Sequence, residues 1–107
     1  MLPKINRADK KTIEKIFKDG RFLNSLNLTF KFIKTNEKER VISFIVPKSV
    51  AKLAVKRNSL RRRGYLAVQK ELELFPLGIK GVFIFKNKEE NIIKLNDEIK
   101  GIINKIN

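Results

Sequence analysis

The sequence contains no cysteine, no histidine and no tryptophan. Without thiols and imidazoles, the chain offers no zinc site of those ligands, no thiol nucleophile and no histidine general base. It also has no long apolar run, no lipidation signal and no apolar signal-peptide core in its first residues, so we expect a cytoplasmic protein without a membrane partner. No glycine-rich phosphate loop is present either. Together these absences favour a protein that binds over one that catalyses.

Positive charge is what the chain has in excess. Its 107 residues carry 25 Lys and Arg against 11 Asp and Glu, a net charge of +14. Charge of one sign on this scale opposes compaction by self-repulsion, so it indicates a polyanionic partner, with nucleic acid favoured over an anionic membrane surface. A hydrophobic content of 42% is sufficient for one core, so residues 1–107 are predicted to form a single domain.

The densest positive charge lies in residues 48–63, which hold seven Lys or Arg residues and no acid. Apolar residues recur through this stretch every three to four positions, which predicts a helix beginning near Ala54 and ending before Pro76. Arg57 projects close to the apolar arc, where a purely structural helix would not carry an arginine. The arc expected to be buried consists of Leu53, Leu60, Gly64, Val68 and Phe75.

Three segments have the patterns of β-strands. Residues 28–34 alternate, so one face is expected in the core while the other carries Lys31 near a ligand. Residues 41–46 follow a charged turn, which predicts a hairpin with the first segment. Residues 82–85 form a continuous apolar run, typical of a strand buried on both faces. Because the basic helix connects the second and third segments, that pair is predicted to be parallel.

Two further helices flank this central part. The first is predicted over Lys10–Lys18, capped by Asp9 and ended by Gly20 as its C′ residue. The last is predicted to be capped by Asn87, with Glu90 completing a capping box, and to continue to the end of the chain. The expected order is therefore α-β-β-α-β-α. In the first helix, Phe17 is expected to pack partly in the core and to offer its ring edge to an unpaired base.

Residues 46–62, V-P-K-S-V-A-K-L-A-V-K-R-N-S-L-R-R, resemble the signature of the protein subunit of bacterial ribonuclease P. In that family, lysines after a strand lead through an alanine-valine pair into an Arg-Asn-Arg motif, followed by a hydrophobic residue and a basic pair. The matching positions are Ala54-Val55, Arg57-Asn58, Leu60 and Arg61-Arg62. Asn6-Arg7 before a short helix ending I-F-K-D-G is also similar to the family's N-terminal pattern.

The sequence departs from that family pattern in several places. Ser59 replaces the second arginine of the motif, which removes one expected phosphate contact, although Arg63 could contact a similar part of the RNA. Ile13 stands where the family usually has a first-helix phenylalanine, which leaves Phe17 as the aromatic candidate. Tyr65 stands where another arginine is common, and the loop before the helix is one residue longer than in the commonest version.

The resemblance implies both a fold and a function. The fold is a two-layer α/β (α+β) sandwich with a small mixed sheet and a left-handed βαβ crossover, similar to the second domain of a small-subunit ribosomal protein. The function is that of an endoribonuclease subunit that assists a catalytic RNA in removing the 5′ leader from precursor tRNA. That RNA would be the catalyst and would hold most of the Mg²⁺, so the protein alone is expected to be inactive and to bind no cofactor.

The resemblance also implies two RNA-binding surfaces on the protein. The residues expected to bind the catalytic RNA are Lys48, Lys52, Lys56, Arg57, Asn58, Arg62 and Arg63. The leader would lie in a cleft between the first helix and the open face of the sheet, lined by Phe17, Lys31, Arg61 and Phe30 or Phe32. Either face of strand 28–34 could form that cleft.

Two other functions fit the composition. One is a ribosomal or other architectural RNA-binding protein of similar fold, which composition alone suits equally well; the ordered motif favours ribonuclease P. The other is a small metal-dependent nuclease, which the absence of histidine and the scattered acids disfavour.

Overall fold

The computed structural model describes residues 9–106, so the predicted basic lead-in, including Asn6-Arg7, lies outside the described residues. Eight elements follow one another in these residues: α1 (Lys10–Asp19), β1 (Arg21–Asn24), β2 (Leu28–Lys34), β3 (Val41–Ile45), α2 (Ala54–Gln69), the short 3₁₀ helix η2 (Leu72–Leu74), β4 (Ile79–Phe85) and α3 (Ile92–Ile106). Within this part of the chain, no helix is both long and apolar enough to cross a membrane.

The four strands form one mixed sheet in the order β1-β2-β4-β3. β3 and β4 are parallel, as predicted, and β4 pairs with β2 in the antiparallel sense. The predicted hairpin between β2 and β3 is wrong, because β4 lies between them. β4 is the most continuously apolar strand, and the centre of the sheet buries it on both faces. β2 instead forms its hairpin with β1, a strand that the sequence patterns did not reveal.

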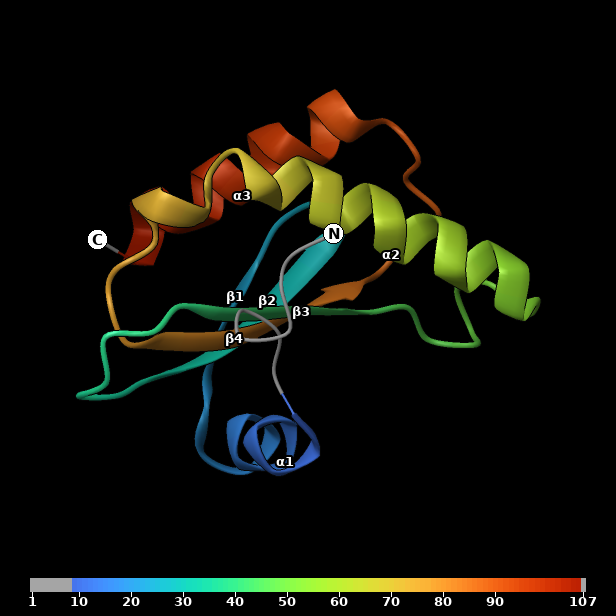
Figure 1. Ribbon diagram of the computed structural model, residues 1–107. Helices are drawn as coiled ribbons and strands as arrows, with labels where there is room; N and C mark the ends of the chain where they lie inside the picture. The colour runs from blue at the N-terminus through green and yellow to red at the C-terminus, as the bar shows by residue number, and fades with distance from the viewer. Residues whose placement is uncertain (1–8, 107) are drawn as a thin grey trace.

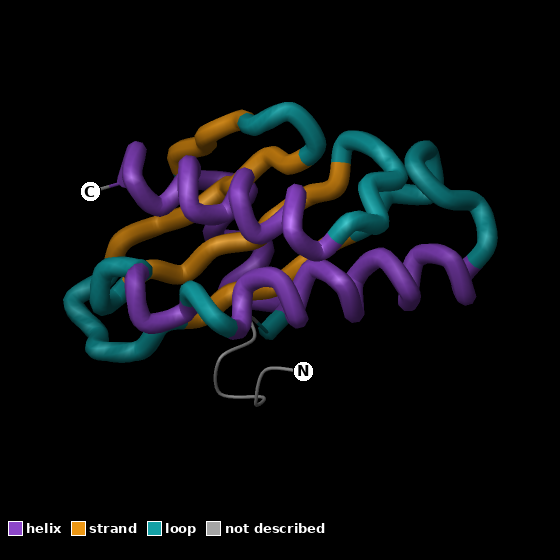
Figure 2. The backbone as a smooth tube through the Cα atoms, turned by 90° about the horizontal axis from the view of Figure 1, so that it is seen from above, coloured by secondary structure: helices purple, strands orange, loops and turns teal. Residues whose placement is uncertain are grey.

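The helices cover both faces of the sheet. Figure 1 shows α2 and α3 over one face and α1 alone against the other, and Figure 2 shows α2 and α3 running side by side above the strands. The sheet with α2 and α3 is the expected two-layer sandwich, to which α1 adds a short layer on the opposite face. The left-handed sense of the β3-α2-β4 crossover stays a prediction.

Stacked phenylalanine rings join the strands under α2 and α3. The ring centroid of Phe83 in β4 lies 4.3 Å from that of Phe30 in β2 and 5.0 Å from that of Phe44 in β3. All three side chains are at most 3% exposed, and such offset ring pairs add to the free energy gained by burial. The main core therefore lies on this face, while Ile16 and Val82, both fully buried, belong to the smaller layer under α1.

α2 is anchored to the sheet at Gly64. A Cβ atom at this position would lie 2.5 Å from Cδ2 of Phe44, so any larger residue would force the ring or the helix to shift. The neighbouring Tyr65 packs edge-on against the same ring, with centroids 5.1 Å apart, and its hydroxyl oxygen accepts a hydrogen bond from the Phe44 N–H at 3.3 Å. The predicted buried arc is confirmed on either side of this point by Leu60 and Val68, which are 2% and 0% exposed.

The first turns of α2 do not follow that prediction. Leu53, expected on the buried arc, is 65% exposed. In Figure 1 the start of α2 extends past the sheet, so no strand lies beneath it to bury an apolar side chain. The predicted arc is therefore wrong at its N-terminal end.

Of the two predicted helix ends, one is confirmed and one is wrong. Gly20 ends α1, as predicted; its φ is −75°, and a Cβ atom there would collide with the Ile16 carbonyl oxygen. Asn87 does not cap the last helix. Asn91 does, since its Oδ1 accepts from the N–H groups of Ile93 and Lys94 at 2.9 and 3.2 Å.

Replacing Gly64 with alanine tests the anchor of α2. Although alanine favours helix, the new methyl group would meet the Phe44 ring, so we expect Gly64→Ala to lower the free energy of unfolding by about 1–3 kcal/mol in a urea titration. Gly101 of α3 is the matched control, because a Cβ atom there meets nothing within 4 Å. Gly101→Ala should raise stability by about 0.5–1 kcal/mol. Equal effects of the two substitutions would contradict the close approach at Gly64.

Candidate nucleic-acid interface

The predicted cations lie together on α2 and on the loop that leads into it. We call this surface the basic face; its members are Lys48, Lys52, Lys56, Arg57, Asn58, Arg61, Arg62 and Arg63. Every residue from Lys52 to Lys56 is exposed, as are Lys48, Asn58 and Arg62. Because α2 is held rigidly at Gly64, these side chains project from a fixed helix instead of a mobile tail. Such an array of fixed positive charges suits a phosphate backbone.

The Arg57 side chain makes hydrogen bonds within the protein. Its Nη1 donates hydrogen bonds to the carbonyl oxygens of Ala51 and Lys52, at 3.1 and 2.7 Å. These contacts explain why an arginine stands close to the apolar arc, since its guanidinium group turns back to hold the preceding loop. Arg57 therefore fixes the loop that carries Lys52, in addition to contributing its own charge to the basic face.

Arg61 and Arg62 differ in how they are held. The Nη2 of Arg61 donates to Oδ1 of Asn58 one turn earlier, and the Arg61 side chain is half-buried. Arg62 is exposed and has no hydrogen bond or ion pair with any residue of the described part of the chain. Arg62 is thus the cation of α2 most available to a partner.

Glu90 brings an acid to the edge of the basic face. Its Oε1 lies 3.4 Å from the Lys56 ammonium nitrogen, in a pair with both side chains more than half exposed, which contributes little stability. Its backbone oxygen accepts a hydrogen bond from Nη1 of Arg63 at 3.2 Å. Arg63, although predicted to bind RNA, therefore also joins α2 to the loop before α3.

A second surface lies on the other side of the sheet, under α1. Phe17 is 43% exposed, and the ammonium nitrogen of Lys31 lies 4.9 Å from its ring centroid, within the range of a cation–π contact. Lys31 is also paired in register with Phe22 of β1, which is 61% exposed. Directly opposite residues of antiparallel strands project to the same face. We call Phe17, Phe22 and Lys31 the aromatic surface.

Phe22 was not predicted as a site residue. It could have been found only by recognising β1 as a strand, which would have placed Phe22 opposite Lys31. The four residues of β1 are too short a segment to show a reliable alternation. What marks Phe22 as a candidate is its exposure in the structure, which could not be predicted from the sequence.

Phe30 and Phe32 are too buried to line an open cleft, so the prediction that placed them in the leader cleft is wrong. Phe30 is fully buried and Phe32 is 4% exposed. Both rings face the core under α2 and α3, where their centroids are 5.2 Å apart. The strand face that carries Lys31 is the one that points to α1, whereas the face that carries Phe30 and Phe32 is buried.

Arg61 belongs to a different layer from the rest of the predicted cleft. Phe17 and Lys31 lie on the α1 side of the sheet, whereas α2 covers the opposite side (Figure 1). The structure therefore does not bring Arg61 together with the aromatic surface. Its assignment to the leader cleft stays a prediction, and its contact with Asn58 associates it with the basic face.

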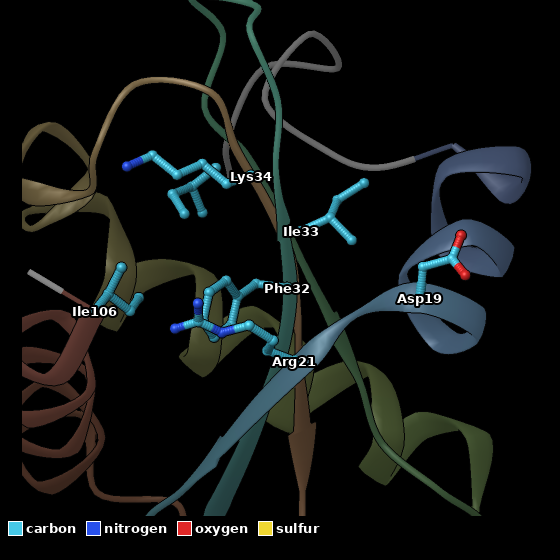
Figure 3. Close-up of a pocket in the computed structure, with 7 residues that line it drawn as sticks. Asp19, Arg21, Phe32, Ile33, Lys34 and Ile106 are labelled. Carbon is cyan, nitrogen blue, oxygen red and sulfur yellow. The ribbon is translucent and has the colours of Figure 1, made fainter.

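A cavity of about 290 Å³ lies at the far end of the sheet, where β2 ends and β4 begins; it is lined by Asp19, Arg21, Phe32, Ile33, Lys34, Ile79 and Ile106. Figure 3 shows the Arg21 side chain beside the Phe32 ring, and the guanidinium carbon lies 5.3 Å from the ring centroid. The strand register places this cavity away from the start of α2, which follows the opposite end of β3. It is therefore separate from the basic face.

Several acids of residues 9–106 have structural contacts. The Thr12 backbone N–H donates to the Asp9 carboxylate at 2.8 Å, and this hydrogen bond lowers the pKa of Asp9. Glu98 accepts hydrogen bonds from Ser25 and from both the backbone and side-chain nitrogens of Asn27. No three acids in this range are close enough together to hold a metal ion.

Comparisons with known proteins agree on one family. A family model described as Ribonuclease P matches residues 3–107. The ribonuclease P protein of Thermotoga maritima aligns with a TM-score of 0.82 over 94% of this chain and 97% of that chain, at 18% identity. The Staphylococcus aureus RNase P protein aligns with a TM-score of 0.79 over 97% and 96% of the two chains, at 12% identity. At these identities the structures show a shared fold. No curated protein matches the chain by sequence.

Arg62 and Arg63 are adjacent but should behave differently when replaced by alanine. Arg62→Ala should leave the thermal unfolding midpoint unchanged and reduce the slope of log binding constant against log salt by about 0.7–0.9 for a bacterial ribonuclease P RNA. Arg63→Ala should lower the free energy of unfolding by about 1 kcal/mol, because the hydrogen bond to the Glu90 carbonyl is lost. A destabilised Arg62→Ala variant, or a fully stable Arg63→Ala variant, would contradict these roles.

Proposed function

The chain belongs to the ribonuclease P protein family, and from this premise we propose that it binds the catalytic RNA through its basic face and the 5′ leader of precursor tRNA through its aromatic surface. Family membership makes it the protein subunit of ribonuclease P, an RNA-binding protein of tRNA processing that works with an RNA component. The proposal adds which surface meets which RNA. The exposed, rigidly held cations of α2 are the observation that carries it.

The basic face suits a folded RNA because the charges are fixed in space and few acids oppose them. Among the described residues, the acids in ion pairs are Glu37, Glu71, Glu89 and Glu90, and of these only Glu90 pairs with a cation of the basic face. Each phosphate contact would release condensed counterions, which gives affinity without sequence preference. Arg62 supplies a free guanidinium group, and a guanidinium can bind a phosphate through two parallel hydrogen bonds.

The aromatic surface suits an unpaired strand. Aromatic rings provide faces on which successive bases stack regardless of sequence, and a nearby cation attracts the backbone. Phe17 and Phe22 are both exposed on the α1 side of the sheet, and Lys31 contacts one ring and lies opposite the other. A 5′ leader, whose sequence differs from one tRNA precursor to another, requires this kind of sequence-tolerant grip.

Catalysis is assigned to the RNA component. Because the chain has no histidine and no cysteine, we propose that it supplies no general base or nucleophile, and that the Mg²⁺ ions of the reaction are held mainly by the RNA. The protein would act by neutralising phosphates, so that the RNA folds and holds substrate with fewer ions. Since precursor tRNA is processed in the bacterial cytoplasm, the proposal includes a cytoplasmic location.

Reconstitution at low Mg²⁺ tests this function directly. Adding the protein to a bacterial ribonuclease P RNA should raise the rate of precursor-tRNA cleavage most strongly where Mg²⁺ is limiting, because protein cations substitute for part of the ionic screening. Protein without RNA should cut nothing. Cleavage that survives ribonuclease treatment of the preparation would contradict the assignment of catalysis, and absence of any stimulation would favour an architectural RNA-binding role.

Substitution of Phe17 tests the aromatic surface. Phe17→Ala should weaken binding of leader-bearing precursor tRNA by about 1–3 kcal/mol if a base stacks on the ring, and should leave affinity for leaderless tRNA unchanged. Phe17→Leu keeps an apolar side chain but removes the ring face, so it should behave like Phe17→Ala. Equal losses for both substrates would show that the effect does not come from the leader.

A further inference from the structure

The start of α2 is an exposed tip. Residues Lys52 to Lys56 are all exposed, and the first residue of the helix that is fully enclosed is Leu60, at 2% exposure. Figure 1 shows this end of α2 extending beyond the strands, away from the body of the molecule. Two apolar side chains stand on the tip, Leu53 at 65% exposure and Val55 at 71%. Nothing in the described part of the fold buries either one.

Leucine is an unfavourable residue at position 53, immediately before α2 begins. It is the N-cap residue of α2, and its side chain makes no capping hydrogen bond. Serine, threonine, aspartate and asparagine are preferred at this position because their oxygen atoms accept from the free N–H groups of the first turn. A leucine here gives up that stabilisation and exposes apolar surface to water. The free protein therefore gains little from this side chain, most of which is exposed.

Val55 has the same character. It is a β-branched residue in the first turn of a helix, where its restricted side chain lowers helix propensity and no packing repays the loss. At 100° per residue it lies on the same outward stripe as Asn58 and Arg62, three and seven positions later. The valine therefore stands within the stripe that carries the exposed, unpaired Arg62.

We propose that Leu53 and Val55 each form an apolar contact with the RNA component, at nucleotides whose bases are unstacked, on two sides of the exposed tip. The inference rests on the proposed function and deepens it by adding a contact that is not electrostatic. Lys52 and Lys56, both exposed, flank the two side chains in the sequence, and Arg57 follows them. We therefore take the partner of the tip to be a polyanion, since two copies of this chain would bring like charges together. On RNA, the base faces and ribose edges are the surfaces that apolar side chains can cover.

The test uses substitutions that leave charge unchanged and do not weaken the helix. Leu53→Ser introduces a favourable N-cap, and Val55→Ala raises helix propensity, so both variants should unfold at or above the wild-type temperature. Each should nevertheless weaken binding to a bacterial ribonuclease P RNA roughly five- to tenfold, as expected for loss of a buried aliphatic side chain. The slope of log affinity against log salt should not change, because no phosphate contact is lost.

Leu74→Ser is the matched control. Leu74 is 56% exposed and lies in η2, beyond the other end of α2, about 24 Å from the tip along a helix of 16 residues. The Leu74→Ser variant should bind RNA as the wild-type protein does.

The outcomes separate this inference from the proposed function. If the wild-type protein binds RNA and both tip variants bind it equally well, this inference alone is overturned. If the wild-type protein fails to bind RNA, the proposed function is overturned. A concentration-dependent dimer in sedimentation velocity that both tip substitutions abolish, with RNA affinity unchanged, would assign the tip to a second copy and also overturn the inference.

Discussion

The contact of α2 with Phe44 is the constraint on which the rest of the structure depends. Gly64 lets the helix backbone approach the Phe44 ring, and Tyr65 holds the same residue through its ring and its hydroxyl group. Phe44 is in turn stacked on Phe83 at the centre of the sheet. The direction of α2 is therefore fixed by the core. Once that direction is set, every cation on the helix has a defined position relative to the strands.

This rigidity explains how a chain of net charge +14 stays compact and still presents its charge. Part of the positive charge has structural contacts, since Arg57 holds the loop before α2 and Arg63 contacts the loop before α3. Other cations remain exposed, with Arg62 the clearest case, and these are the charges that the proposal assigns to RNA. The aromatic surface lies on the opposite side of the sheet, so two RNA segments could be bound at once without competing for the same residues.

The sequence predicted what depends on local pattern. The basic helix beginning at Ala54 and the parallel pairing of β3 with β4 followed from periodicity and chain order. The family resemblance added the function, which the family match supports. Arg57 also stood out from its place near the apolar arc, although its hydrogen bonds to the loop could not be read from spacing.

What the sequence did not predict depends on contacts between distant segments. The order of strands was missed because β4, which follows α2 in the chain, lies between β2 and β3 in the sheet. Phe30 and Phe32 alternate with Lys31, but which face would be covered depends on where α2 and α3 pack. Leu53 fits a buried helical stripe by spacing, and only the overhang of α2 beyond the sheet leaves it exposed.

Site-directed crosslinking in the assembled ribonucleoprotein tests the separation of the two surfaces most directly. A photoreactive group attached in place of Asn58, on the basic face, should label the RNA component, and one in place of Phe17, on the aromatic surface, should label the 5′ leader of bound precursor tRNA. Labelling of the same RNA segment from both positions, or labelling of the leader from Asn58 and not from Phe17, would contradict the account.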